Sequence, residues 1–339
     1  MTPMISEINQ LRADVEALAP PAGRKVGTTG HAAARRFLLD RFASLGLTPF
    51  RRGDFDLPYE MLHQRFHNLV GIVPGRDWRK PPILVGAHYD SVIQAPCADD
   101  NAAAVAIGLS LAEELLRKNP GRDTLIALFD AEEPPFYLSP AMGSIRFFQD
   151  HGDSRGFHAA LIMDLVGHDV PMPLPAFQDV FPNFGKLLFV TGAESHPALG
   201  PIVRRNAVDP ELLLVATQNR LVGDLSDHHI FRTQGVPYLF FSCGRWEHYH
   251  NFSDTPGRLN YHKMLRIRNL LLGLIEGLAA VDLLRASEAD TTELEIDLLR
   301  TAFGPGLEFL LDLIGMPQLQ TRQDLDSLSM RLQDMFRLK

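Results

Sequence analysis

The sequence contains little cysteine and tryptophan, two residues of each in 339. Two cysteines, Cys97 and Cys243, are too few for a disulfide framework, so nothing requires an oxidising compartment, although the sequence leaves one disulfide between them open. No stretch approaches the roughly 18 uninterrupted apolar residues of a membrane helix. The N-terminus carries acidic side chains and no apolar segment of the secretory-signal type. These absences predict a cytoplasmic protein without a membrane partner.

Basic residues are also scarce relative to acidic ones. Lys and Arg total 33 against 41 Asp and Glu, a net charge of −8, which argues against a nucleic-acid partner because such a surface needs clustered Lys and Arg. We find no internal repeat and no low-complexity linker. We expect one domain over residues 1–339, with a helical N-terminal segment (about 1–48) and a helical C-terminal extension (about 288–339).

Apolar periodicity predicts alternating helices and strands. Helices are expected at residues 5–18, 31–45, 101–118 and 261–284. Strands are expected at residues 68–73, 83–87, 125–129, 160–165, 187–190, 212–216 and 238–242. Asp99 or Asp100 suits the N-cap of the third helix. The alternation indicates an α/β protein, a three-layer α/β/α sandwich with a mixed, largely parallel central sheet.

The pattern is helical again from residue 292, and Gly304–Pro305–Gly306 interrupts it. An apolar stripe at helical spacing is formed by Leu325, Leu328, Leu332 and Met335. The stripe favours an amphipathic helix packed on the domain over a dimer contact.

Acidic and imidazole side chains collect where the predicted strands end. They are His88 and Asp90 in VGAHYDS, Asp99–Asp100–Asn101 in CADDNAAAVA, Glu132–Glu133 in LFDAEEPP, Asp164 in LIMDLVG and His250 in HYHNFSDTP. Polar groups are costly to bury without partners, and the carboxyl edge of an open α/β sheet forms the ligand crevice. A divalent metal centre explains such a cluster, so the sequence predicts a metalloenzyme.

The residue types allow a division of roles. Imidazole and carboxylate ligands suit zinc, and a two-metal hydrolase needs a carboxylate that bridges the ions. Asp100 suits the bridge, with His88 and Asp164 on one metal and Glu133 and His250 on the other. Spacing alone does not choose Asp100 over Asp99.

Two further acidic residues suit supporting and catalytic roles. Asp90 follows His88 by two residues and is placed to accept a hydrogen bond from its ring. Glu132 is left without a metal and suits a general base that takes a proton from activated water. Taken singly, these patterns also describe a hydrogen-bonded histidine, a helix cap and a solvated turn. A non-catalytic scaffold with a structural zinc is the weaker hypothesis, because such sites are closed and usually rich in Cys.

The motifs HYDS, DDNAAAVA, FDAEE, MDLVG, SDHHIF with GVP, and YHNFSDT resemble the zinc exopeptidases of peptidase family M28, of the bacterial leucyl aminopeptidase type. That superfamily also contains the glutaminyl cyclases. The resemblance covers about residues 20–285 and implies the zinc-exopeptidase (phosphorylase/hydrolase-like) fold. It implies zinc ligands at His88, Asp100, Glu133, Asp164 and His250. It also implies that Glu132 is the catalytic carboxylate, that Asp227 lies beside the ligands, and that Asp100 is the bridge because it directly precedes the Asn position.

The resemblance leaves two activities open. An aminopeptidase uses two zinc ions and water to hydrolyse the N-terminal peptide bond, whereas a glutaminyl cyclase uses one zinc and the amine of the substrate's own N-terminal glutamine. The loop from Pro134 to Met142 is long, as in the cyclases, but Leu138 and Tyr249 stand where cyclases carry pocket tryptophans, with Trp246 slightly upstream. We therefore favour an aminopeptidase acting on a peptide or small amide.

Loop aromatics provide a weaker prediction about the substrate pocket. An apolar wall that favours large hydrophobic N-terminal residues is expected from Phe136, Tyr137, Leu138, Phe177, Phe181, Phe184 and Trp246. The alternative is that these side chains pack in satellite parts of the core.

Overall fold

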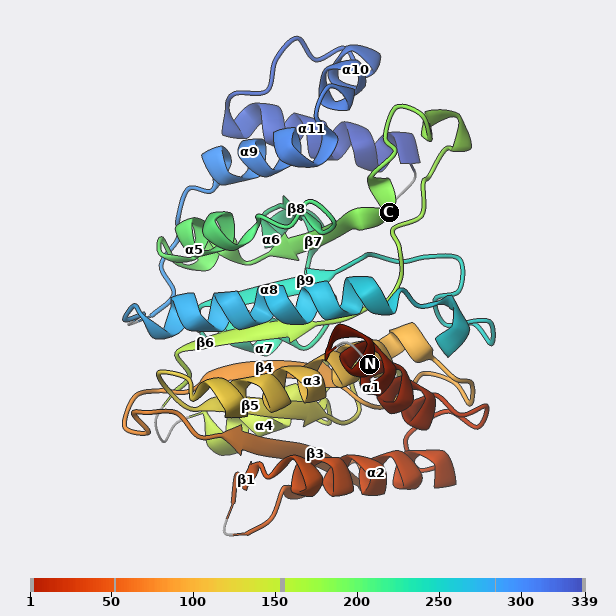
Figure 1. Ribbon diagram of the computed structural model, residues 1–339, viewed down its shortest axis with the longest axis vertical. Coiled ribbons are helices and arrows are strands. Elements are labelled where there is room, and N and C mark those ends of the chain that lie inside the picture. Colours follow the sequence, from red (N-terminus) through yellow and green to blue (C-terminus); the bar gives the residue numbers. More distant parts are fainter. Residues whose placement is uncertain (1–2, 52, 153–155, 284, 337–339) are drawn as a thin grey trace.

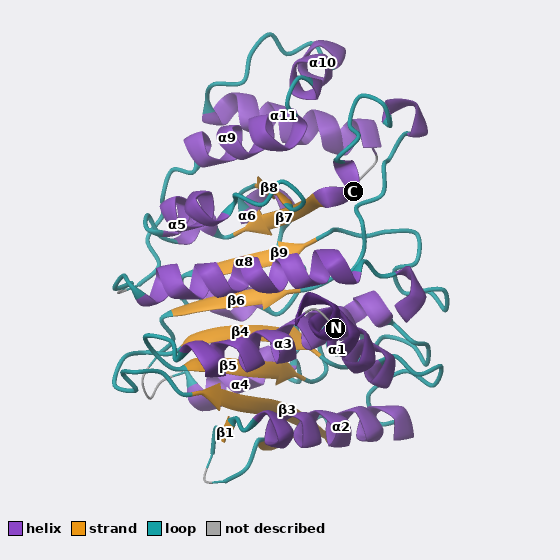
Figure 2. Cartoon of the chain, in the orientation of Figure 1, coloured by secondary structure: helices purple, strands orange, loops and turns teal. Residues whose placement is uncertain are grey.

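The computed structural model describes residues 3–51, 53–152, 156–283 and 285–336, and it has three layers with a sheet in the middle (Figures 1 and 2). The nine strands within these residues are β1 (Thr48–Pro49), β2 (Asp56–Met61), β3 (Gln64–Val73), β4 (Ile83–His88), β5 (Thr124–Phe129), β6 (Ala159–Met163), β7 (Leu187–Thr191), β8 (Leu213–Ala216) and β9 (Tyr238–Ser242). Their order across the sheet is β1-β3-β5-β4-β6-β9-β7-β8, and β2 pairs with β3 outside this path.

The centre of the sheet is parallel and its flanks are antiparallel, which confirms the mixed α/β sandwich. β5, β4, β6 and β9 run in one direction, while β3 and β7 run against their inner neighbours. His88, the last residue of β4, lies opposite Phe129, the last residue of β5. Residues that follow β4, β5, β6 and β9 therefore emerge at one edge of the sheet, and this common edge positions the candidate site.

Helices cover both faces of the sheet. They are α1 (Pro3–Leu18), α2 (Thr29–Leu45), α3 (Ala103–Lys118), α4 (Gly143–His151), α5 (Leu199–Asn206), α6 (Asn219–Val222), α7 (His228–Thr233), α8 (Tyr261–Ala279), α9 (Thr292–Phe303), α10 (Gly306–Leu313) and α11 (Arg322–Phe336). Helices α1, α2, α3 and α8 pack on one face and share one apolar core, whereas α4 and α7 pack on the other (Figure 1). Among the described residues, no helix combines the length and apolar character needed to cross a bilayer.

Shorter helical segments complete the chain. Turns of 3-10 helix lie at Pro175–Phe177, Phe184–Lys186, Ala193–Ser195 and Pro256–Arg258, and a π-helical segment lies at Ala98–Ala102. The strands β1 and β2 and the helices α4 to α7 were not predicted, because each is too short to show its period over more than about two turns or a few alternations. In addition, β2 contains Pro58, which is tolerated because β2 lies outside the main strand path.

The predicted acidic N-cap of the third helix is wrong. Helix α3 begins at Ala103, and its cap residue, Ala102, makes no side-chain capping bond. Asp99 and Asp100 are buried in the preceding π-helical segment and bind other partners. The disulfide left open by the sequence is also absent from the described residues, in which Cys97 and Cys243 are buried and free.

The C-terminal extension packs on the domain, as the apolar stripe predicted, and its place there is the edge of the sheet. Helix α9 lies along β8, and α11 contacts α9 (Figure 1). Leu325 and Leu328 are 5% and 3% exposed, and the side chain of Met335 lies outside the described residues. The extension therefore covers a strand edge that would otherwise present unpaired backbone groups.

Arg322 is expected to anchor this extension. Its guanidinium donates to both carboxylate oxygens of Glu295, at 2.7 and 2.9 Å, and Glu295 is 2% exposed. Arg322→Ala leaves a buried carboxylate with one hydroxyl partner, that of Thr291. We expect a loss of about 2–3 kcal/mol in the free energy of unfolding, below the usual value for a buried pair because Arg322 is partly solvated. Urea unfolding measures it; an equal loss in Arg300→Ala, an exposed α9 position, would contradict the prediction.

Candidate metal centre

The five side chains predicted as metal ligands converge at the common strand edge. His88 ends β4, Asp164 directly follows β6, and Glu133 lies four residues beyond the end of β5. Asp100 lies in the π-helical segment before α3, and His250 lies in the loop after β9. The ends of four neighbouring strands and the loops that follow them therefore supply the cluster, which explains why its members are scattered over more than 160 residues of sequence yet share one location.

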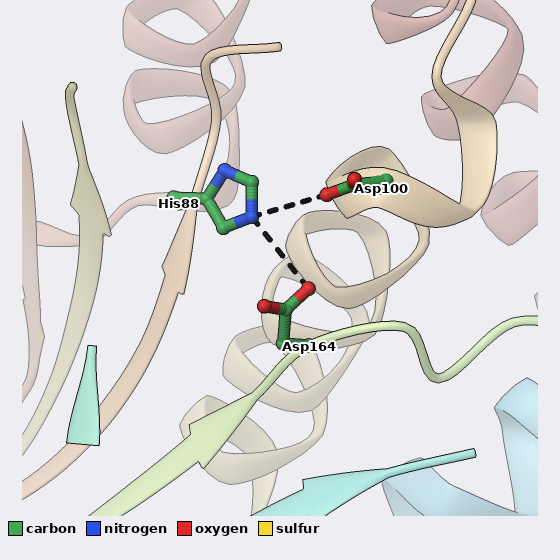
Figure 3. Close-up of side chains that lie close together, drawn as sticks. All are labelled: His88, Asp100 and Asp164. Atoms are coloured by element: carbon green, nitrogen blue, oxygen red, sulfur yellow. Dashed lines mark ion pairs between the residues drawn. The ribbon is translucent and has the colours of Figure 1, made fainter. Parts of the chain in front are cut away.

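The first group consists of His88, Asp100 and Asp164 (Figure 3). The Nε2 atom of His88 lies 3.3 Å from Oδ1 of Asp100 and 3.6 Å from Oδ1 of Asp164. His88 and Asp100 are 0% and 3% exposed. One ligand atom from each residue lies within 4.8 Å of the other two, which is close enough for the three to hold one ion.

The second group consists of Asp100, Glu133 and His250, and it shares Asp100 with the first. The Nε2 atom of His250 lies 3.2 Å from Oδ2 of Asp100 and 3.3 Å from Oε2 of Glu133. The two carboxylate oxygens of Asp100 thus face different histidines, Oδ1 toward His88 and Oδ2 toward His250. This is the arrangement required of a carboxylate that bridges two metal ions.

The described residues fit a divalent metal by a second criterion, the hydrogen bonds that they do not make. Ligand atoms that are buried without a hydrogen-bond partner are Nδ1 and Nε2 of His88, Oδ2 of Asp100, Oε1 of Glu133, Oδ1 of Asp164 and Nε2 of His250. A buried polar atom without a partner costs about 1–3 kcal/mol. Coordination to metal ions satisfies such atoms, and a donor set of imidazoles and carboxylates suits zinc and related divalent ions.

The electrostatics show that negative charge is concentrated in this buried cluster. Burial and the neighbouring charge of Asp100 raise the pKa of Glu133 to about 8. Burial lowers the pKa of His88, but the surrounding carboxylates, first that of Glu132, outweigh it and raise that pKa well above its ordinary value. Both shifts arise because carboxylates outnumber imidazoles in the cluster. Divalent ions would compensate this negative charge.

The part of the sequence that carries the cluster matches a known family. Residues 68–275, which span the strands and loops that carry the cluster, match peptidase family M28. The chain belongs to peptidase family M28. The family resemblance noted in the motifs is therefore confirmed, and the M28 match implies zinc as the ion for these residues.

Known relatives and structures agree with this assignment. The uncharacterized protein YfbL of Escherichia coli K12 is 29% identical over 218 residues, which are 58% of this chain and 66% of YfbL. The LapA aminopeptidase of Legionella pneumophila has a TM-score of 0.63 at 17% identity, over 81% of this chain and 71% of LapA. A glutaminyl cyclase of Fimbriiglobus ruber has a TM-score of 0.63 at 22% identity, over 80% of this chain and 95% of the cyclase. At these identities the structures show a shared fold, which aminopeptidases and cyclases have in common.

Asp90 and Glu132 lie beside the ligands of this M28 chain. Oδ1 of Asp90 is 3.3 Å from Nδ1 of His88, and the Asp90 carboxylate also accepts hydrogen bonds from the backbone N–H groups of Glu132 and Glu133. Asp90 therefore contacts a ligand ring and holds the Glu pair in place. Glu132 is 5% exposed, and its Oε2 lies 3.8 Å from Nε2 of His88. Glu132 belongs to neither ligand group, so its carboxylate lies beside the two groups without being needed as a ligand.

Three of the other predicted site residues have defined surroundings. The Tyr249 ring stacks on His250 at a centroid distance of 3.7 Å, and Trp246 stacks on His168 at 4.4 Å. Asp227 is 0% exposed, both of its carboxylate oxygens lack a hydrogen-bond partner, and burial raises its pKa to about 7. These features are consistent with the prediction that Asp227 lies beside the ligand groups.

Leu138 and the neighbouring aromatics occupy the long loop after Glu133. Leu138 is 44% exposed, while the Tyr137 hydroxyl donates a hydrogen bond to the backbone carbonyl of Asp224 and ties this loop to the one before α7. The Phe136 ring packs edge-on against Phe66 at 5.0 Å, within a small core cluster. Phe136 therefore packs against the core with part of its ring exposed, whereas the Leu138 side chain faces solvent.

Three aromatics expected in the pocket pack elsewhere in the M28 chain. Phe177 contacts Phe309 of α10, and both Phe181 and Phe184 contact Phe303 of α9. The structure assigns these rings to the packing of the C-terminal extension, which is the satellite-core alternative. Periodicity could not decide this, because the three lie in a long loop between β6 and β7 whose path depends on the extension.

Several residues of the centre were missed at the sequence level. Asp254 was visible only as part of the NFSDT motif, and Arg24 only as the start of a helix-forming segment. Asp99 was considered a helix cap, but its carboxylate accepts a bond from the N–H of Gly167 and pairs with Nδ1 of His168 at 2.6 Å. No composition or spacing signal separates a buried arginine or aspartate from an exposed one, so these roles needed the structure.

Proposed function

We propose that this chain is a zinc-dependent aminopeptidase that uses two zinc ions to hydrolyse the N-terminal bond of a peptide or small amide. The observation that carries the proposal is the position of Asp100, whose two oxygens face two different histidines. Asp164 completes the group around His88, and Glu133 completes the group around His250. The result is two adjacent ligand groups around a shared carboxylate.

The chain's own groups suit hydrolysis by this centre. When bound, zinc supplies Lewis acidity, which polarises a carbonyl and makes water acidic enough to lose a proton near neutral pH. Glu132 would accept this proton and donate it to the leaving amine, because it is a buried carboxylate beside His88 that belongs to neither ligand group. Asp90 orients both ends of this arrangement through the His88 ring and the backbone of Glu132.

A glutaminyl cyclase is the second candidate, and the long loop at residues 134–142 favours it. The cyclase reaction uses one zinc and consumes no water. His88 and Asp164 favour the aminopeptidase instead. With Asp100 they form a group of three that could hold one ion, in addition to the group around His250. A non-catalytic zinc scaffold fits less well, because Glu132 is a buried carboxylate that lies beside both ligand groups and belongs to neither.

The deciding experiment pairs metal stoichiometry with turnover. We expect two zinc ions per chain, release of nitroaniline from leucine p-nitroanilide, and no ammonia from a peptide with N-terminal glutamine. One zinc per chain with ammonia release from the glutaminyl peptide would overturn the proposal in favour of the cyclase. Zinc binding without turnover of either substrate, unchanged in Glu132→Gln, would favour the scaffold.

A further inference from the structure

The backbone on both sides of the Asp100 side chain is held by buried charged groups. Asp254 is 0% exposed, and its carboxylate accepts hydrogen bonds from the N–H of Asp99, at 2.9 and 3.1 Å, and from the N–H of Asp100, at 3.2 Å. The carbonyl oxygen of Asp254 also accepts a bond from the N–H of Ala98 at 3.2 Å. One residue thus binds three successive amides of the segment that carries the shared carboxylate.

Arg24 holds the other side of this segment. It is 0% exposed, and its five guanidinium N–H groups match five bonds to backbone carbonyls. The acceptors are the carbonyls of Leu18, Tyr89 (2.8 Å), Pro96 (2.8 Å), Cys97 (2.9 Å) and Asp100 (3.2 Å). The carbonyl of Asp100 is therefore bound by Arg24, while its N–H is bound by Asp254.

These two side chains join three parts of the chain at the centre. Arg24 belongs to the segment between α1 and α2, and it binds the loop that connects His88 to Asp100. Asp254 lies four residues after His250, so it links the loop of one histidine to the backbone of the carboxylate that the histidine faces. Neither side chain is a member of a ligand group. Their contacts are with backbone atoms, which suits a role in orienting the segment.

We propose that Arg24 and Asp254 are positioning residues that hold Asp100 in the orientation in which its two oxygens face His88 and His250. This inference rests on the proposed two-zinc centre. A carboxylate that must bridge two ions tolerates little rotation, since turning it toward one histidine moves it away from the other. Lysine cannot replace Arg24 in this role, because its three donors cannot satisfy five carbonyls.

The test compares two variants with matched controls. Arg24→Lys keeps the positive charge but loses the five-bond fork, and Asp254→Asn keeps the shape but places an NH2 group against backbone donors. The controls change residues of the same type at the opposite end of the strands. Arg122→Lys alters an arginine that is 1% exposed and binds the carbonyls of Pro81 and Val281, and Asp123→Asn alters an aspartate that accepts the N–H of Gly75.

Three readouts on the full chain separate positioning from folding. They are the zinc dissociation constant by chelator competition, the visible absorption spectrum of the cobalt-substituted protein, and thermal unfolding of the metal-free protein. We expect about 10–100-fold weaker zinc binding and a changed cobalt spectrum in Arg24→Lys and Asp254→Asn. Both controls should bind zinc as the unmodified protein does, even where their unfolding temperature falls.

Specific outcomes would overturn the inference. The inference is overturned if Arg24→Lys folds and its zinc affinity and cobalt spectrum are unchanged. If Asp254→Asn does not fold, the result for Arg24→Lys alone is used. Equal loss of zinc affinity in Arg122→Lys and Asp123→Asn would also overturn it, because the effect would then follow general destabilisation. If the unmodified protein bound no zinc, the proposed function would fail as well. Failure of the proposed two-zinc centre and failure of the positioning role of Arg24 and Asp254 therefore give different results.

Discussion

Glu132→Gln is expected to lower kcat by about 10²–10⁴-fold while leaving two zinc ions per chain. The amide cannot accept a proton, so attack by water loses its general base, and it cannot later protonate the leaving amine. Zinc is retained because Glu132 belongs to neither ligand group, although its Oε2 lies only 3.8 Å from Nε2 of His88. Steady-state kinetics on leucine p-nitroanilide, with zinc measured on the same sample, provide the test.

A matched control separates this loss from a general effect of removing a buried charge. Glu194 is a half-buried glutamate that accepts backbone N–H groups of Gly192 and Asn219, outside the ligand groups. Glu194→Gln should keep its activity within about threefold, which corresponds to a change of less than 1 kcal/mol in the activation free energy. Glu132→Gln with normal kcat, or with its zinc lost, would show that Glu132 is not the base.

Asp100→Ala is expected to remove both zinc ions and with them all activity above background. Its two oxygens complete both ligand groups, so each group is left with two ligands, whereas hydrolytic zinc sites use three. Asp164→Ala removes a ligand from the His88 group alone and should leave about one zinc per chain. Metal analysis after dialysis against zinc-free buffer measures both variants.

The difference between these two variants is the sharpest expectation. If Asp100→Ala and Asp164→Ala each retained one zinc, Asp100 would be a ligand of a single ion and the shared-carboxylate arrangement would be wrong. Asp14→Asn provides the control, because Asp14 is 2% exposed but pairs with Arg41 of α2. It should keep two zinc ions even if it lowers thermal stability.

The centre of the fold followed from the sequence because its strands are buried on both faces. β4 and β5 are apolar at nearly every position, and such runs are typical of parallel strands between helix layers. The antiparallel flank was harder to predict, because β2 contains a proline within its short alternating pattern and β1 spans only Thr48–Pro49. The C-terminal helices were visible as a stripe, but their position along β8 was not.

The choice between Asp99 and Asp100 shows where sequence reasoning stopped. Spacing treated the two adjacent carboxylates alike, and only the family motif favoured Asp100. The structure provides the physical reason. The oxygens of Asp99 are occupied by the N–H of Gly167 and by His168, whereas those of Asp100 face His88 and His250. A carboxylate without protein donors on its oxygens is the one available to metal ions.

Apolar periods and the residues that interrupt them are local properties, so the amino-acid sequence was enough to predict the sandwich, the carboxyl ends of its strands as the site, and the residue types there. The folded chain was needed to show that the oxygens of Asp100 face two histidines, which loop aromatics pack in the core, and that Arg24 and Asp254 hold the Asp100 backbone. Those roles depend on contacts between residues 76 and 154 positions apart, respectively. A charged side chain has the same identity in the sequence whether it faces water or five buried carbonyls, and only the folded chain distinguishes the two.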